Sequence, residues 1–283
     1  MSGLADPAAQ EELLQKSRSR RFRLAPEPGD EAMERRRLEQ DLRHTLSQDA
    51  FILHYQPRVA LTSGATSGAE ALIRWPHRKR GMVSPALFLP VAERSALGTR
   101  IGGWVLRAAC EEAARWPPAA TLSVNVSARH LLDGALLEQM AAALDASGLE
   151  PERLELEIAE SVLIAIGDDP LLTLSAIRDL GVGIALDNFG TGSASLNVLT
   201  RLPLTSLKLD RCMTRPVPRD REAAAIVRAV LDSGHALGLG VVAEGIETEA
   251  QRAFLAGIGC DEGQGHLFSQ ALPPAQVRER LRR

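Results

Sequence analysis

The sequence predicts a closed barrel of the α/β class, in which short buried strands alternate with amphipathic helices. The first observation is a series of short apolar runs, such as LSVNV, GIALD and GLGVVAE, each with a charged or amide side chain near its end. The second is their spacing, because these strand ends recur roughly every thirty residues, the length of a strand–helix unit. Roughly seven or eight such units favour a closed barrel, with an open doubly wound sheet as the alternative.

The first part of the chain carries one predicted helix and two predicted strands. Residues 30–46 place Met33, Leu38, Leu42 and Leu46 near helical spacing, which indicates an amphipathic helix. Segments 50–61 and 68–75 have the composition of strands and flank the turn TSGATSG, so the barrel should begin with a hairpin. We therefore divide the chain into a basic tail with a connecting helix, residues 1–45, and a barrel domain, residues 46–283.

Helices and strands alternate regularly after Pro85. We expect Gly102 and Gly103 to interrupt the first long helical segment, because glycine weakens a helix. The predicted helices cover residues 86–116, 135–148, 170–181, 193–203, 221–238, 248–259 and 275–283. The predicted strands cover residues 122–127, 153–159, 182–189, 205–210 and 240–246, with a short last strand near 266–269.

Six polar residues lie at the ends of successive predicted strands: Glu70, Asn125, Glu157, Asp187, Lys208 and Glu244. A carboxylate, an amide or a lysine is costly to bury in such a position unless it binds a charged partner. In a parallel barrel, catalytic groups collect at the carboxyl ends of the strands. Oxygen ligands without histidine or cysteine suit a hard cation such as magnesium, manganese or calcium.

Composition and charge exclude several classes of protein. Apolar residues make up 45% of the chain, and the net charge of -3 gives no electrostatic reason to expect DNA or RNA binding. The three cysteines lack metal-type spacing and are predicted to be small core residues in a reducing compartment. Neither a secretory leader nor an apolar run long enough for a bilayer is present, so we expect a cytoplasmic protein without membrane insertion.

Seven motifs follow one another along the chain: EAL (70–72), NVS (125–127), ELEIAES (155–161), DNFGTG (187–192), KLD (208–210), AEGIET (243–248) and GCDEGQGHLFS (259–269). With these motifs, the segment from Leu46 to the C-terminus resembles the EAL-domain cyclic-di-GMP phosphodiesterases. EAL alone would be a trivial tripeptide, whereas the ordered series is specific. The resemblance implies a modified TIM (β/α)8 barrel whose first strand is antiparallel, in agreement with the early hairpin.

The resemblance implies that one phosphodiester bond of cyclic di-GMP is hydrolysed to give linear pGpG, with one or two Mg²⁺ or Mn²⁺ ions. By analogy with the family, Glu70 and Lys208 would be catalytic together with Glu244, and Lys208 would orient or help deprotonate the attacking water. The implied metal ligands are Glu70, Asn125, Glu157 and Asp187 for the first ion, with Asn188 and Glu244 near a second.

Substrate contacts are also implied by the resemblance, at Gln56, Leu72, Arg74, Asp210 and Gln264. Arg74 would bind a phosphate, for which a guanidinium group is well suited. Asp210 would accept hydrogen bonds from a guanine edge, or it could merely cap the chain after its strand. Glu160 would hold the DNFGTG loop in place. The six histidines form no pair of the kind found in the unrelated histidine-based phosphodiesterases.

Three residues depart from the family's pattern. Asn188 stands where members that hydrolyse well usually carry a second aspartate, and Ala159 and Ser193 replace a threonine and a tyrosine. The amide lacks the charge that would retain a second cation, and one such change can lower a rate roughly 10²–10³-fold. We therefore expect a phosphodiesterase of reduced activity. The alternative is a weak or inactive domain that acts as a cyclic-di-GMP receptor or a protein-interaction module.

The N-terminal segment up to Leu46 is similar to the connector between the GGDEF and EAL domains of tandem proteins. The chain is then either a free-standing relic of such a tandem or part of a longer protein. The connecting helix could pack on its own barrel, which we favour, or pair with another copy. The resemblance also implies a homodimer, and the N-terminal segment could bind a protein partner.

Overall fold

The structure is a computed structural model that describes residues 28–166, 171–192 and 197–283. The chain divides between Asp41 and Leu42 into two units, each of which is described by itself. Helix α2 (Pro28–Ser47) begins in the first unit and agrees with the helix predicted for residues 30–46. The basic tail that precedes it lies outside the described residues up to residue 27, and so does Ser193.

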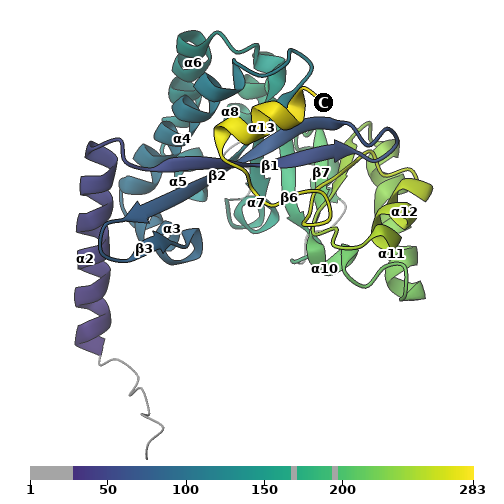
Figure 1. Cartoon of the computed structure of the whole chain (residues 1–283), viewed down its shortest axis with the longest axis horizontal. Coiled ribbons are helices and arrows are strands. Elements are labelled where there is room, and N and C mark those ends of the chain that lie inside the picture. The colour runs from purple at the N-terminus through teal and green to yellow at the C-terminus, as the bar shows by residue number, and fades with distance from the viewer. Residues whose placement is uncertain (1–27, 167–170, 193–196) are drawn as a thin grey trace, which may run out of the picture. The chain divides into compact units, whose positions relative to one another are not determined.

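Eight of nine strands in one sheet form a closed ring (Figure 1). The ring order is β1 (Ile52–Ala60), β9 (Glu262–Gly263), β8 (Gly240–Ala243), β7 (Ser206–Leu209), β6 (Gly183–Phe189), β5 (Leu154–Ala159), β4 (Thr121–Val126) and β2 (Thr66–His77). β1 is antiparallel to both neighbours, and the other pairs of the ring are parallel. The predicted modified (β/α)8 barrel with an antiparallel first strand is confirmed. β3 (Gly81–Val83) extends β2 outside the ring.

Helices connect the strands and lie on the outer side of the ring, with α4 and α6 side by side (Figure 1). They are α3 (Pro85–Glu93), α4 (Leu97–Ala113), α5 (Ala128–Leu132), α6 (Leu136–Ser147), α7 (Glu160–Ile166), α8 (Leu171–Asp179), α9 (Asn197–Arg201), α10 (Arg211–Thr214), α11 (Arg221–Ala236), α12 (Glu249–Gly257) and α13 (Pro274–Leu281), with a 3₁₀ turn at Pro151–Arg153. In the described ranges, no helix has both the length and the apolar character needed to span a membrane.

The apolar core lies largely between the strands and these helices. Trp75 and Tyr55 on the first hairpin and Phe88 on α3 are among the largest fully buried side chains. The rings of Trp75 and Phe88 meet edge to face with their centroids 5.3 Å apart, a favourable aromatic arrangement. This packing covers the outer side of the antiparallel hairpin and leaves the polar side chains of the strands facing into the barrel.

The predicted break at Gly102 and Gly103 is wrong. Helix α4 continues through both glycines, and the helical path is interrupted earlier, between α3 and α4. A Cβ atom at Gly102 would overlap the buried ring of His130, and one at Gly103 would overlap the side-chain amide of Gln139. The glycines therefore let α4 pack closely against α5 and α6.

Two smaller corrections concern the C-terminal half of the chain. The last strand is β9 at Glu262–Gly263, and residues 266–268 form a turn where the strand was predicted. There the backbone of Ile246 bonds Gln264 on one side and Leu267 on the other, which takes the chain out of the sheet. Of the cysteines predicted to be core residues, Cys212 is exposed on the short helix α10, whereas the other two are buried.

Candidate active site at the carboxyl ends of the strands

The barrel places the six predicted strand-end residues at one end of the ring. Glu70 lies on β2, opposite Gln56 of β1, and Asn125 on β4 lies opposite Glu157 of β5. Asp187 and Lys208 lie on β6 and β7, and Glu244 directly follows β8. Alternate residues of a strand point to the same side, so the side chains of one row meet inside the barrel. The predicted convergence of these residues is therefore present.

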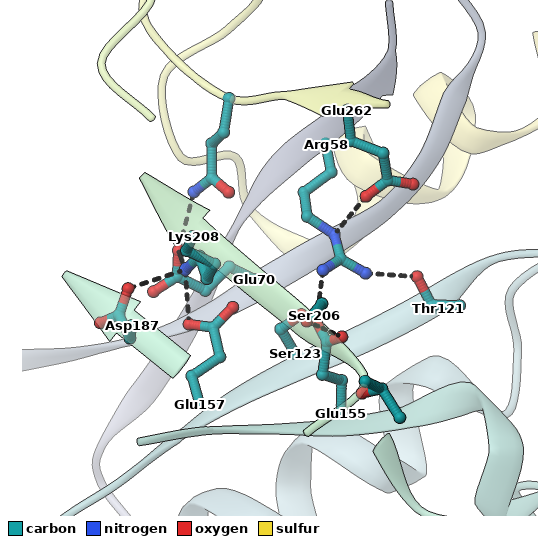
Figure 2. Close-up of polar contacts among 12 residues, drawn as sticks. Arg58, Glu70, Thr121, Ser123, Glu155, Glu157, Asp187, Ser206, Lys208 and Glu262 are labelled. Atoms are coloured by element: carbon teal, nitrogen blue, oxygen red, sulfur yellow. Dashed lines mark hydrogen bonds and ion pairs between the residues drawn. The ribbon is translucent and has the colours of Figure 1, made fainter. Parts of the chain in front are cut away.

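Lys208 lies at the centre of four carboxylates, which we call the acidic cluster: Glu70, Glu157, Asp187 and Glu244. Figure 2 shows Lys208 with the first three of them. Its Nζ atom is 2.7 Å from Glu157 Oε2 and from Glu244 Oε1, and 3.5 Å from Glu70 Oε2 and from Asp187 Oδ1. The lysine is 1% exposed. A buried ammonium group is tolerated here because carboxylates surround it.

The surrounding charges determine the protonation of Lys208. Burial alone would lower the pKa of its ammonium group, but the carboxylates, led by Glu157 and Glu70, raise the pKa well above its usual value. Lys208 therefore stays charged at neutral pH. It can donate hydrogen bonds and cannot readily accept a proton.

The carboxylates differ in how readily they ionise. Burial, followed by repulsion from Glu70, raises the pKa of Glu157 well above its usual value. Burial also raises the pKa of Glu244, to about 7, with Lys208 opposing the shift. Burial acts in the same direction on Glu70, but Lys208 and two amide hydrogen bonds lower its pKa overall. The cluster thus contains one carboxylate whose pKa is lowered, Glu70, and others whose pKa is raised, of which Glu244 can exchange a proton near neutral pH.

Two amides hold Glu70 in place. Asn125 Nδ2 donates to Glu70 Oε1 at 2.7 Å, and Gln264 Nε2 donates to Glu70 Oε2, also at 2.7 Å. The same Gln264 nitrogen lies 3.2 Å from Gln56 Oε1. These hydrogen bonds join β4, β2, β1 and the residue after β9, and they give Glu70 a defined orientation.

Asn188 occupies a special backbone position beside the cluster. Its φ angle is +56°, a left-handed conformation that asparagine and aspartate tolerate better than most residues. Its Nδ2 atom donates to Asp187 Oδ2 at 2.6 Å. The following loop is held by Glu160, whose Oε2 accepts a hydrogen bond from the Gly190 amide at 3.1 Å, as the predicted loop-supporting contact requires.

Two cavities flank the acidic cluster and share the side chains of Glu70 and Leu72. The larger cavity, about 510 Å³, is lined by predicted substrate residues Gln56, Asp210 and Gln264 as well as by Asp187, Asn188 and Glu244. The smaller, about 390 Å³, is mostly apolar and is lined by Arg74 and Asn125 among others. Asp210 lines the larger cavity, where a substrate contact was predicted. It also caps α10 by accepting a hydrogen bond from the Cys212 amide at 2.7 Å, which was the alternative role considered for it.

The family model of the EAL domain matches residues 39–271. The chain belongs to the EAL domain family. It is 40% identical to the bifunctional diguanylate cyclase/cyclic di-GMP phosphodiesterase MucR of Pseudomonas aeruginosa, in an alignment that covers 87% of this chain and 36% of MucR. It is also 40% identical to a cyclic di-GMP phosphodiesterase of the same organism, with 84% of this chain and 41% of that protein covered. The chain thus spans about two fifths or less of these relatives.

The solved structures include the PaMucR phosphodiesterase in complex with c-di-GMP. This EAL domain matches it with a TM-score of 0.80 at 40% identity, over 85% of this chain and 99% of that one. The likeness therefore extends over most of this chain and nearly all of the solved one.

The donor atoms of the EAL domain's acidic cluster fit a hard divalent cation. The ligands are all oxygens, and Asp187 Oδ1 and both carboxylate oxygens of Glu157 are buried without accepting a hydrogen bond from any described residue. Glu157 Oε2 nevertheless lies 2.7 Å from Lys208 Nζ, a charge contact without hydrogen-bond geometry. Within the described ranges, no three histidine, cysteine, aspartate or glutamate side chains are already arranged around a metal position. A cation would therefore have to share the carboxylates with Lys208.

A second polar layer of the EAL domain was missed in the sequence. Arg58, which is 3% exposed, lies deeper inside the barrel and pairs with Glu155 (Figure 2). The sequence does contain a pattern that indicates this layer: a polar residue lies two positions before several strand-end residues. These pairs are Ser123 and Asn125, Glu155 and Glu157, Ser206 and Lys208, and Glu262 and Gln264. Three further residues line the larger cavity and gave no comparable periodic signal: Arg211 at the start of α10, and Glu247 and His266 in loops.

Proposed function

We propose that this EAL domain hydrolyses one phosphodiester bond of cyclic di-GMP to give linear pGpG with the help of Mg²⁺ or Mn²⁺. The observation that carries the proposal is the acidic cluster around Lys208, at the mouth of the barrel and open to a cavity of about 510 Å³. Carboxylates with unsatisfied oxygens next to a fixed positive charge are suited to phosphoryl chemistry.

Glu70, Asn125, Glu157 and Asp187 would hold the first cation, because they present oxygen atoms from four neighbouring strands. Glu244 and the carbonyl oxygen of Asn188 would lie nearest a second. When bound, a divalent ion lowers the pKa of a water molecule and neutralises charge on phosphoryl oxygens.

Lys208 and Glu244 would divide the handling of the attacking water between them. Because the pKa of Lys208 is raised, its Nζ atom would orient the water by donating a hydrogen bond. Glu244, whose pKa is raised to about 7, could take up a proton at a carboxylate oxygen near neutral pH. Of the two roles that the resemblance allowed for Lys208, we therefore propose the orienting one.

The two cavities supply space for a ligand with two bases on either side of Glu70. Gln56, Asp210 and Gln264 would contact one nucleotide in the larger cavity, with Asp210 Oδ atoms as acceptors for a guanine edge. Leu72 and the partly buried Arg74 would contact the other in the smaller, apolar cavity. A scissile phosphate between the cavities would then lie beside the acidic cluster.

A second candidate function is a receptor that binds cyclic di-GMP without hydrolysing it. The contact between Asn188 and Asp187 favours it, because the amide occupies one oxygen of Asp187 and adds no charge for a second cation. The retained cluster and Lys208 favour the enzyme, which we place first, with activity reduced by Asn188.

The deciding experiment follows pGpG by chromatography after purified protein meets cyclic di-GMP in Mg²⁺, in Mn²⁺ and in EDTA. We expect metal-dependent pGpG that disappears in EDTA and in Glu70→Ala. Calorimetric binding without product would instead identify a receptor. Absence of both product and binding would overturn both functions and direct attention to a protein partner.

We also propose a homodimer, and a protein partner for the N-terminal segment, on the family resemblance alone. Light scattering after size-exclusion chromatography should give twice the mass of one chain. A single-chain mass at all tested concentrations would contradict the dimer.

A further inference from the structure

The polar layer below the acidic cluster links four strands through one side chain. Arg58 on β1 contacts Glu155 of β5 at 2.5 Å through Nη1 and Thr121 of β4 at 2.6 Å through Nη2. Its Nε atom lies 3.4 Å from Glu262 Oε2 on β9. Glu155 also accepts hydrogen bonds from Ser123 at 3.0 Å and Ser206 at 2.7 Å (Figure 2).

The pair of Arg58 and Glu155 carries opposite charges that stabilise each other. Burial would raise the pKa of Glu155, but Arg58 and the two serines lower it overall. Burial would lower the pKa of Arg58, but the charge of Glu155 raises it overall. Both groups therefore remain ionised as a neutral pair, and removing both together leaves the net charge of the barrel interior unchanged.

Room for this layer is provided on β2. Gly68 lies opposite Arg58 of β1 and opposite Thr121 of β4 in the same row of the sheet. A Cβ atom at Gly68 would overlap the Thr121 carbonyl and hydroxyl oxygens. The missing side chain thus permits Thr121 to approach β2 and accept the hydrogen bond from Arg58.

The layer stands in register with the residues above it. On the parallel strands, Ser123, Glu155, Ser206 and Glu262 each precede a site residue by two positions. On the antiparallel strand, Arg58 follows Gln56 by two. Residues two apart on a strand point to the same side roughly 6.6 Å apart. A shift of β1 or β9 at the lower layer would therefore be passed to Gln56 and Gln264.

The junction between β1 and β9 is where such a shift is easiest. The ring closes there through two residue pairs, Val59 with Gly263 and Ala60 with Glu262, whereas β1 and β2 pair along nearly their whole length. Arg58 spans this short junction by contacting Glu262. Above it, Gln264 spans the same junction by contacting Gln56 and Glu70.

We propose that Arg58 is a positioning residue: together with Glu155 and Glu262 it fixes the junction of β1 and β9 and thereby holds the Gln264 amide on Glu70. The inference rests on the proposed function for its catalytic consequence, because Glu70 is one of the groups that would hold the cation. The structural part of the proposal, that Arg58 fixes the orientation of Gln264, does not depend on the proposed function.

The test compares wild type with the double variant Arg58→Met/Glu155→Gln, which removes both charges of the pair and leaves Glu262, whose side chain is 25% exposed, without its contact to Arg58. We expect a folded protein whose Mn²⁺ affinity, titrated by electron paramagnetic resonance, falls about 10- to 100-fold, the range for partners that orient metal ligands. kcat/KM for cyclic di-GMP should fall as well, because Gln264 contacts Glu70 and also lines the larger cavity. Arg58→Lys, which keeps the charge but not the planar fork, should show the same direction with a Tm near wild type.

The matched control is Arg278→Met/Glu112→Gln, which removes another partly buried ion pair, 3.0 Å long, between α13 and α4. It should lower Tm and leave Mn²⁺ affinity and kcat/KM unchanged. Wild-type Mn²⁺ affinity in the folded Arg58→Met/Glu155→Gln variant would overturn the proposal. So would an equal loss in the control.

A crystal structure of each double variant separates this proposal from the proposed function. The contact between Gln264 Nε2 and Glu70 Oε2, 2.7 Å in the wild type, should be broken in the Arg58 variant and kept in the control. A kept contact in both would refute the positioning role whatever the enzyme does. A wild type that forms no pGpG would refute the hydrolysis while this comparison still decides the role of Arg58.

Discussion

At the residue scale, Asn188 places a neutral amide in the site where an aspartate would add a negative charge. Its left-handed backbone directs the side chain at Asp187, where it donates a hydrogen bond instead of adding a negative charge. Lys208 then contributes the positive charge among four carboxylates. The balance leaves less negative charge available for a second cation than an aspartate would.

Replacing Asn188 with aspartate should have opposite effects with and without metal. In EDTA, Asn188→Asp should lower Tm, because a hydrogen bond is lost and two like charges become neighbours. Adding Mg²⁺ or Mn²⁺ should raise the Tm of Asn188→Asp by more than it raises the Tm of wild type. The rate of pGpG formation should also rise, by up to roughly 10²–10³-fold. Differential scanning fluorimetry and chromatography give the two readouts.

Gln48→Glu is the matched control, because it makes the same amide-to-carboxylate change at an exposed position. It should alter neither Tm nor turnover appreciably. Equal metal-dependent Tm gains in Asn188→Asp and wild type would show that Asn188 does not limit cation binding.

The raised pKa of Glu244 predicts a pH dependence of stability in the absence of metal. Its folded pKa of about 7 exceeds the usual value of 4.5, so the folded protein holds this proton more tightly than the unfolded chain does. The contribution to stability is therefore complete below pH 4.5 and is lost as pH rises toward 7. The loss should be on the order of 2–3 kcal/mol.

Thermal unfolding in EDTA between pH 5 and pH 8 checks this dependence. Tm should fall across that interval in wild type and fall less in Glu244→Gln, which cannot ionise. Mg²⁺ should reduce the fall, because a bound cation favours the carboxylate form. Identical slopes in wild type and Glu244→Gln would contradict the role given to Glu244.

At the scale of elements, glycines in α4 serve helix packing. Gly102 and Gly103 face His130 of α5 and Gln139 of α6, where any side chain would overlap a neighbour. Helices that approach this closely need small residues at the contact, even though glycine disfavours the helix itself. The cost in helix propensity is offset by the packing that it permits.

Gly102→Ala should therefore destabilise the protein although alanine is the better helix former. We expect a loss of about 1–3 kcal/mol in the free energy of unfolding, measured in urea, because the His130 ring must move. Gly257→Ala in α12 is the control, since a Cβ atom there would meet nothing within 4 Å. That change should stabilise the protein by about 0.5–1 kcal/mol. Equal stabilities of the two variants would contradict the packing role.

At the scale of the whole molecule, the barrel unit begins before its first strand. Leu42 and Thr45 lie in the last part of α2 that belongs to this unit. Leu42 is 0% exposed, and Trp75 Nε1 donates a hydrogen bond to Thr45 Oγ1 at 2.9 Å. These contacts are part of the barrel's own core, so the unit should fold without the residues that precede Leu42.

Two truncations test this boundary. A protein of residues 42–283 should unfold at nearly the wild-type Tm and keep its affinity for cyclic di-GMP, if the full chain binds it. A protein of residues 47–283 should lose about 2–4 kcal/mol of stability, because Leu42 and the hydrogen bond to Trp75 are gone. Equal urea midpoints for the two proteins would show that these contacts contribute little.

The sequence allowed much of the barrel to be predicted from alternation and spacing. Strand ends such as Asn125 and Asp187 were recognisable because a polar residue interrupts an apolar run, and the hairpin anticipated the antiparallel β1. The missed layer around Arg58 had the same period, but Arg58 and Glu155 lie far apart in the chain, so their pairing could not be inferred. Gly102 was misread because glycine disfavours helices locally and favours close packing between them.

The sequence by itself determined the order of strands and helices, the residue at each strand end and the amide at position 188, because these depend on local pattern and residue identity. The tertiary structure decided which of those residues meet. Ring closure brings Lys208 within 3.5 Å of four carboxylates and Arg58 against Glu155. The nearby carboxylates raise the pKa of Lys208, and burial in the closed ring raises the pKa of Glu244. Charge interactions depend on distance and burial, which only the folded chain defines.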